Sequence, residues 1–355
     1  MEQLSYLEYL LFSLFSTKKS RKAMTVYHIV SGKRTASILY QAEIYQLSAY
    51  FSLFSKLKKE QYQKIIEKGI TLKLLIYENE EQLLLTEKGV QWLETYFSSH
   101  HLPVNLNLLH YGRWVNEFWR RVLFLSQVLS EIRYENKGYL PIEKEWRIQI
   151  WVKSWLQKQK LERSLVAKDF GAEWLNLGST LSEQKMTILV GYLSGYNTIG
   201  QTTQQLATSL ATEPSEISVS LVEALCEMIV EIQQNKVVYP LLYQIQAELE
   251  QSIGAVSQSI RKTEEELKNG LSLEDITQMR QLKLSTVSEH MIELAIIDPK
   301  FSVRAVIKNQ PFVEVSQLLQ VNPSCTYTEI KEQFPEVPFY VYRIVQLERW
   351  RADNE

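Results

Sequence analysis

Residues 263–296 read TEEELKNGLSLEDITQMRQLKLSTVSEHMIELAI, and their pattern predicts three short helices in a row. Ser272 and Asp275 have the spacing of a helix cap, and Ser285 starts another helix at Thr286. The four-residue turn 281–284 between these two helices is typical of a helix-turn-helix, in which the second helix is presented to a partner.

The first of the three helices is predicted to begin at Thr263, with Glu266 completing a capping box. Lys268 and Gly270 mark its end. The other two helices each have an apolar face that we expect to be buried: Ile276 and Met279 on one, and Val287, Met291 and Leu294 on the other.

The opposite face of the third helix lacks the side chains that usually read DNA. It carries no Lys or Arg, and its exposed positions are predicted to be Thr286, Ser288, Glu289, His290, Ile292 and Glu293. Carboxylates repel phosphate, whereas base-reading helices use Arg, Lys, Asn or Gln. We therefore predict a protein contact through Ser288, Glu289 and Ile292, with a purely structural role of this face as the alternative.

The composition, 45% hydrophobic and 23% charged over 355 residues, is that of a globular protein with two to four domains. We expect a mainly α fold: a multi-domain array of helix-turn-helix and winged-helix units with one small β-hairpin wing. The expected domains are a winged-helix-like domain (1–100), a Trp-rich helical domain (101–178), a helix-turn-helix-like unit (179–254) and a tandem helix-turn-helix domain (255–355).

The amino-terminal hundred residues have a net positive charge. They hold 13 Lys or Arg against 10 Glu, whereas residues 261–355 hold 12 against 15 acidic residues. Strands over 72–77 and 82–85, followed by a helix from Glu87, predict the wing. Because of this excess of positive charge, any direct nucleic-acid contact is expected within residues 1–100. The candidate contacts are Lys18, Lys19, Arg21, Lys22, Lys33 and Arg34.

The middle of the chain contains six tryptophans at helical spacing, which are typical of a buried core, with a peptide-binding groove as the alternative. Arg120 and Arg121 lie beside Trp119, where they either stack, contact phosphate or line a solvated helix edge. Residues 100–110 contain three histidines without cysteine or carboxylate at ligand spacing, so no metal site is expected.

No catalytic motif, cofactor-binding loop or small-molecule site is evident, and we predict a non-enzyme. The two cysteines, Cys226 and Cys325, are far apart and fit a reducing compartment. No apolar run approaches the length of a membrane helix and no signal peptide is evident, so a cytoplasmic location is expected.

Once these elements are placed, the chain resembles the YpbB-like helix-turn-helix proteins. The resemblance is most specific over residues 270–295, GLSLEDITQMRQLKLSTVSEHMIELA, and extends to YHIVSGKRTAS (27–37) and FWRRVLFLSQ (118–127). Thr277 and Gln281 stand where the usual pattern has a small Ala and a turn Gly.

The resemblance implies an accessory protein encoded beside a RecQ-type DNA helicase, which would be its partner in DNA unwinding or repair. This chain contains no helicase motor motif, so any ATPase activity would belong to that partner. The alternative is a stand-alone DNA-binding transcriptional regulator, which would need a broad basic surface and a base-reading helix.

Overall fold

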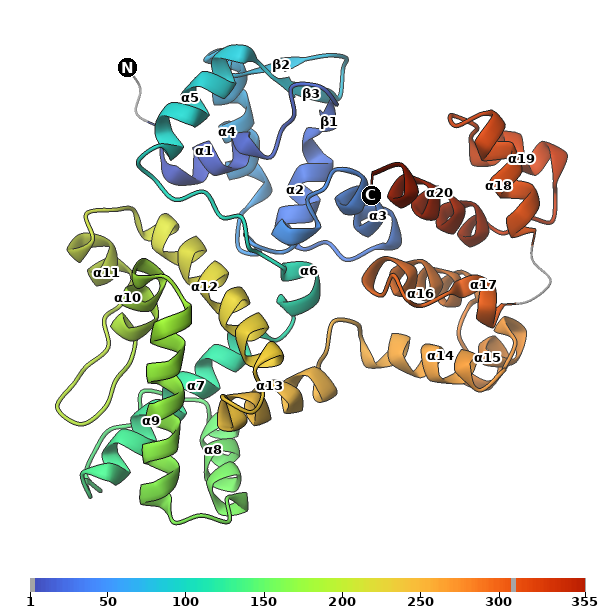
Figure 1. Ribbon diagram of the computed structural model, residues 1–355. Helices are drawn as coiled ribbons and strands as arrows, with labels where there is room; N and C mark the ends of the chain where they lie inside the picture. Colours follow the sequence, from blue (N-terminus) through green and yellow to red (C-terminus); the bar gives the residue numbers. More distant parts are fainter. Residues whose placement is uncertain (1–3, 308–310, 355) are drawn as a thin grey trace.

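The computed structural model describes residues 4–307 and 311–354 (Figure 1). Within these residues the chain forms twenty α-helices and one small antiparallel sheet, which confirms the mainly α fold class. Both ends of the chain lie in the upper part of Figure 1, and the helices of the middle form the lower part.

The amino-terminal unit has the element order of a winged helix. Its helices are α1 (Tyr6–Ser13), α2 (Ala23–Ser31), α3 (Ala36–Ile44), α4 (Lys59–Thr71) and α5 (Glu87–Phe97), with a short 3₁₀ turn, η1 (Ser48–Tyr50), after α3. Ser5, Thr35 and Thr86 cap α1, α3 and α5 with their hydroxyl oxygens. The sequence did not predict α2.

The sheet has three strands in the order β1-β3-β2. The predicted hairpin is present as β2 (Leu75–Tyr77) and β3 (Gln82–Leu85), with Ile76 opposite Leu84. The additional strand β1 (Arg21–Lys22) pairs with the outer edge of β3, with Arg21 opposite Leu83. Two residues are too few for an alternating pattern, so β1 could not be predicted from the sequence.

The middle of the chain is entirely helical. It contains α6 (Leu108–Tyr111), α7 (Val115–Arg133), α8 (Trp146–Lys158), α9 (Arg163–Thr180), α10 (Glu183–Gly191), α11 (Thr203–Ser209), α12 (Pro214–Gln234) and α13 (Pro240–Ser252). The predicted tryptophan core is largely present, because Trp114, Trp119 and Trp155 are buried. Trp146 departs from it, with 71% of its surface exposed.

The carboxy-terminal part has helices at the positions of both predicted helix-turn-helix units. The first is α14 (Gln258–Lys268), α15 (Leu273–Arg280) and α16 (Leu284–Ile297), and a short helix, α17 (Val303–Val306), follows it. The second is α18 (Phe312–Val321), α19 (Tyr327–Gln333) and α20 (Phe339–Asn354). Thr326 and Glu329 cap α19 reciprocally, and α20 packs against α16.

One hydrophobic core joins the two ends of the chain. The same buried cluster contains Leu39 of α3, Ile276 of α15, Val287 of α16 and Val341 of α20. A second cluster fills the middle, with Trp114 of α7 and Leu242 of α13 among its members. The amino-terminal winged-helix unit is therefore packed on the helix-turn-helix units that follow it by more than 150 residues in the sequence.

Candidate nucleic-acid and partner interfaces

The local structure of the first helix-turn-helix agrees with the sequence prediction at α15 and differs from it at the starts of the two neighbouring helices. Ser272 and Asp275 form the predicted capping box of α15. Gln281 ends that helix in the left-handed conformation with φ of 52°, at the position where glycine is usual. Helix α16 begins at Leu284 after Lys283, so the prediction that Ser285 caps it was wrong by two residues.

The predicted start of α14 was also wrong. Ser257 caps this helix, and Thr263 is a fully buried residue in its interior. The Thr263 hydroxyl lies 2.8 Å from Nδ1 of His290 and accepts a hydrogen bond from Arg280. A capping pattern and a buried polar contact both favour threonine, so the sequence could not separate them.

The helix expected to be presented to a partner is mostly enclosed. From Met291 to Ile297 every residue of α16 is buried, because α3 lies against one side of the helix and α20 against another. Ile292, with 2% of its surface exposed, is therefore not a surface residue, which corrects its predicted place in the partner contact. His290 and Glu293 are buried as well, contrary to their expected exposure, and burial lowers the pKa of His290.

Only the amino-terminal turn of α16 and the preceding turn remain accessible. Glu289 is exposed and Ser288 half-buried, as their predicted place in a contact requires. Met279, which the sequence placed in the core, is 57% exposed, and Leu284 on the other side of the turn is 50% exposed. These four residues define the turn surface of the helix-turn-helix.

Two of the six predicted nucleic-acid contacts have structural roles. Arg34 pairs with Glu293 of α16 at 2.8 Å and donates to the carbonyl oxygen of Ala255 at 2.7 Å. The guanidinium of Arg21 donates to the carbonyl oxygens of Leu14 and Tyr45, and burial lowers the pKa of Arg21. Neither charge is free to neutralise a phosphate.

The other four predicted contacts are exposed, but they do not form one patch. Lys22 pairs with Glu81 at the wing tip at 2.5 Å. Lys18 and Lys19 precede β1, whereas Lys33 follows the opposite end of α2, a helix of nine residues and hence about 13 Å long. The sequence cluster is therefore divided between two ends of the unit.

A group of lysines that the sequence analysis did not single out lies next to Lys33. Lys56, Lys58 and Lys59 lead into α4, the helix that precedes the wing, and all three are exposed. Lys33 and Lys59 both lie near His28 of α2. Burial lowers the pKa of His28, and these two positive charges lower it further. We call Lys33, Lys56, Lys58 and Lys59 the α4 lysine cluster; the run KLKK at 56–59 was its only signal in the sequence.

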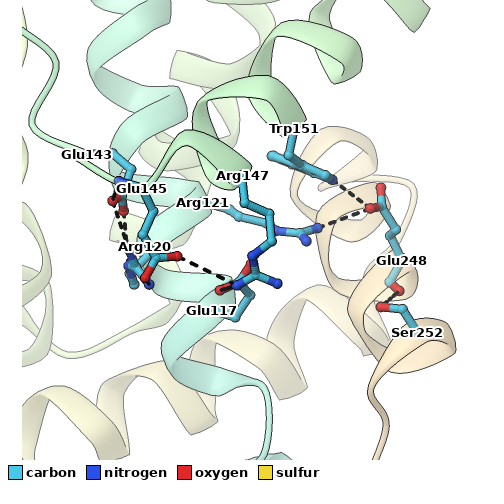
Figure 2. Close-up of polar contacts among 9 residues, drawn as sticks. All are labelled: Glu117, Arg120, Arg121, Glu143, Glu145, Arg147, Trp151, Glu248 and Ser252. Atoms are coloured by element: carbon cyan, nitrogen blue, oxygen red, sulfur yellow. Dashed lines mark hydrogen bonds and ion pairs between the residues drawn. The ribbon is translucent and has the colours of Figure 1, made fainter. Parts of the chain in front are cut away.

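Three arginines of the middle unit, Arg120, Arg121 and Arg147, form internal ion pairs (Figure 2). Arg120 binds both carboxylate oxygens of Glu143, at 2.8 and 3.0 Å. Arg121 is buried, pairs with Glu248 of α13 at 3.1 Å, and stacks on Trp151 instead of the neighbouring Trp119. These pairs hold α8 and α13 against α7, and they leave neither arginine free for phosphate.

The histidines between α5 and α6 also have partners within the protein. Nε2 of His101 lies 2.6 Å from Glu223 of α12, which also accepts hydrogen bonds from the backbone N–H groups of Val104 and Asn105. Burial alone would raise the pKa of Glu223, but these donors outweigh it and lower the pKa to about 2. Within the described residues no group of three His, Cys, Asp or Glu side chains could hold a metal ion.

The fold and these units define a helical protein built from helix-turn-helix and winged-helix units, a class related to DNA binding. A family model described as a helix-turn-helix domain matches residues 259–346. Protein YpbB of Bacillus subtilis (strain 168) is 22% identical over 300 residues, which are 84% of this chain and 84% of that protein. These matches confirm the similarity to the YpbB-like helix-turn-helix family.

No solved structure matches the chain. In the part of the chain that the structure describes, no helix is long and apolar enough to cross a membrane.

Proposed function

We propose that this chain is a non-enzymatic accessory protein of a RecQ-type DNA helicase, acting in DNA unwinding or repair through protein contacts and an auxiliary DNA contact. The resemblance to the YpbB-like family supports the helicase as the partner. The observation that carries the proposal is the burial of α16: with α3 and α20 packed against it, only its amino-terminal part is accessible, and α16 itself contains no Lys or Arg for the major groove.

The protein contact in this proposal is the turn surface, Met279, Leu284, Ser288 and Glu289. Two half-exposed apolar side chains beside an exposed carboxylate suit a protein partner, because a phosphate backbone would gain nothing from the first and be repelled by the second. Ile292, which the sequence analysis included, is replaced here by Met279 and Leu284.

The partner contact can be tested by affinity measurement between the purified full-length chain and the RecQ-type helicase of the same organism. The variant Met279→Ser/Leu284→Ser/Glu289→Lys should bind at least tenfold more weakly with little change in melting temperature, because exposed positions contribute about 0.5 kcal/mol or less to stability. Glu314→Lys, at an exposed position of α18, is the matched charge control. Unchanged affinity in the triple variant would exclude the turn surface as the contact site. No binding by the wild-type chain would exclude the helicase as its partner.

The auxiliary DNA contact in this proposal is the α4 lysine cluster. If its four lysines each bind one phosphate, the α4 lysine cluster variant, in which all four are replaced by Gln, should have a slope of log K against log salt about 3.6 less steep than wild type. Lys18→Gln/Lys19→Gln, at the other end of α2, is the comparison variant. DNA binding that responds to the comparison variant but not to the cluster would place the contact elsewhere.

A stand-alone DNA-binding regulator is the alternative, and one observation favours it. Helix α4 exposes Lys59, Gln61, Gln63 and Lys64, and Lys and Gln are among the side chains that read base edges. Footprinting on genomic fragments separates the two functions, since a regulator protects defined sequences and an accessory protein binds duplexes of any sequence.

A further inference from the structure

The hairpin formed by α8 and α9 carries a concentration of unpaired positive charge. Between residues 153 and 168 there are five cations and a single carboxylate, Glu162, in a chain whose net charge is −2. All five cations are exposed: Lys153, Lys158, Lys160, Arg163 and Lys168. None of them forms an ion pair with any residue that the structure describes.

These charges are close together because of the helix geometry. Helix α8 ends at Lys158, α9 begins at Arg163, and four residues join them. Lys153 and Lys168 each lie five residues from the connection, which is about 8 Å along a helix. The five α-carbons therefore lie within about a turn and a half of the hairpin tip.

Three other arginines of the same unit have carboxylate partners. Arg120, Arg121 and Arg147 all contact carboxylates of α7, α13 or the loop before α8 (Figure 2). The tip differs from this paired region because five cations lie close together there without an ion-pair partner among the described residues. Such charge is unfavourable in the free protein through self-repulsion and becomes favourable when an anionic partner binds.

We propose that the α8–α9 tip is a second nucleic-acid contact, which binds the phosphate backbone of duplex DNA without reading sequence. The described tip has no exposed aromatic ring on which an unpaired base could stack, since Trp155 is buried, and this favours a duplex over a single strand. The inference rests on the proposed role in DNA metabolism but uses different residues.

A cavity of about 720 Å³ beside the tip limits where the backbone can lie. Its lining includes Lys158 and Lys160, but also the carboxyl groups of Asp169 and Glu173. Phosphates are therefore expected on the outer side of the tip and not inside this cavity. Figure 1 places the tip at the opposite end of the molecule from the amino-terminal unit, so one contact cannot substitute for the other.

The test compares two full-length variants with the same loss of charge. Lys153→Gln/Lys158→Gln/Lys160→Gln/Arg163→Gln neutralises four of the five tip cations and leaves Lys168. Lys137→Gln/Lys262→Gln/Lys300→Gln/Lys331→Gln neutralises four exposed lysines elsewhere. Duplex affinity is measured against salt concentration; the tip variant should have a slope about 3 to 4 less steep than wild type, and the control should change it by less than about 1.

Equal slopes for the two variants would overturn the proposal, because the loss would then reflect net charge alone. Leu161 and Val237 expose apolar surface near the tip, so vesicles containing phosphatidylserine provide a further comparison. Loss of vesicle binding with unchanged DNA binding would assign the tip to a membrane surface and would also overturn the proposal.

The outcome separates this proposal from the proposed function. If the tip variant retains wild-type DNA affinity and slope while the α4 lysine cluster variant loses them, the tip is excluded and the auxiliary DNA contact remains. If the wild-type chain shows no salt-dependent DNA affinity, both proposed DNA contacts, the α8–α9 tip and the α4 lysine cluster, are excluded. Helicase binding by the tip variant is measured in parallel and should equal that of wild type.

Discussion

Glu293 is the residue whose replacement most directly tests how the two ends of the chain are joined. It lies on α16, is buried, and forms an ion pair with Arg34 of the amino-terminal unit. Arg113 is close to both of these charges: burial lowers the pKa of Arg113, Arg34 lowers it further, and Glu293 opposes the shift. Arg261 is a further cation in this group. Glu293→Gln removes the carboxylate that compensates them.

The expected cost follows from two losses. A hydrogen bond to a charged group contributes about 1.5–3 kcal/mol, and the amide of Gln retains part of it. The guanidinium groups of Arg34 and Arg113 then repel each other without a carboxylate between them, which adds about 1 kcal/mol near a protein surface. We expect Glu293→Gln to lower the free energy of unfolding by about 2–3 kcal/mol.

Arg34→Met should cost less than Glu293→Gln, because Arg113 can then take over as the partner of Glu293. The free energy of unfolding of wild type and of both variants is measured in urea on the full chain. Circular dichroism monitors the unfolding, at low and at high salt. A larger loss for Arg34→Met, or no loss for Glu293→Gln, would refute this account of the junction. If Arg34→Met left stability unchanged and weakened DNA binding, the phosphate contact predicted from the sequence would be correct.

Three further substitutions test other parts of the structure. Ile276→Ala removes a fully buried side chain from the core shared by both chain ends, and should cost about 2–4 kcal/mol and shift the thermal transition of the amino-terminal unit as well. Gln281→Gly should stabilise the protein by about 0.5–1 kcal/mol in thermal melts, because φ is 52° at this position; a loss would contradict the strained turn. Burial raises the pKa of Glu173 from 4.5 to about 7 although two backbone N–H groups donate to it, so its protonated form is favoured in the fold. The free energy of unfolding should therefore fall by on the order of 3 kcal/mol between pH 4.5 and 7 on its account, and Glu173→Gln should flatten that fall in urea titrations.

Local patterns were sufficient for most helices. The capping box of Ser272 and Asp275, the cap at Thr326, the proline at the start of α12 and the break at Gly254 are each formed by residues a few positions apart. Their energetics are set within one or two turns of chain, so the sequence alone determines them. The wing was predictable for the same reason, since strands β2 and β3 are joined by a short turn.

Exposure of the candidate site residues was not predictable, because it depends on which distant element covers each helix face. The spacing of Ile292 and Glu293 is compatible with an outer face, but both are buried in the folded chain, where α3 and α20 pack against α16. Arg21 and Arg34 are equally suited to phosphate or to a carbonyl or carboxylate partner; the tertiary structure supplies Leu14, Tyr45, Ala255 and Glu293. The sequence thus determined the helices and the class of protein, whereas the packing of the two chain ends decided which charges remain free for a partner.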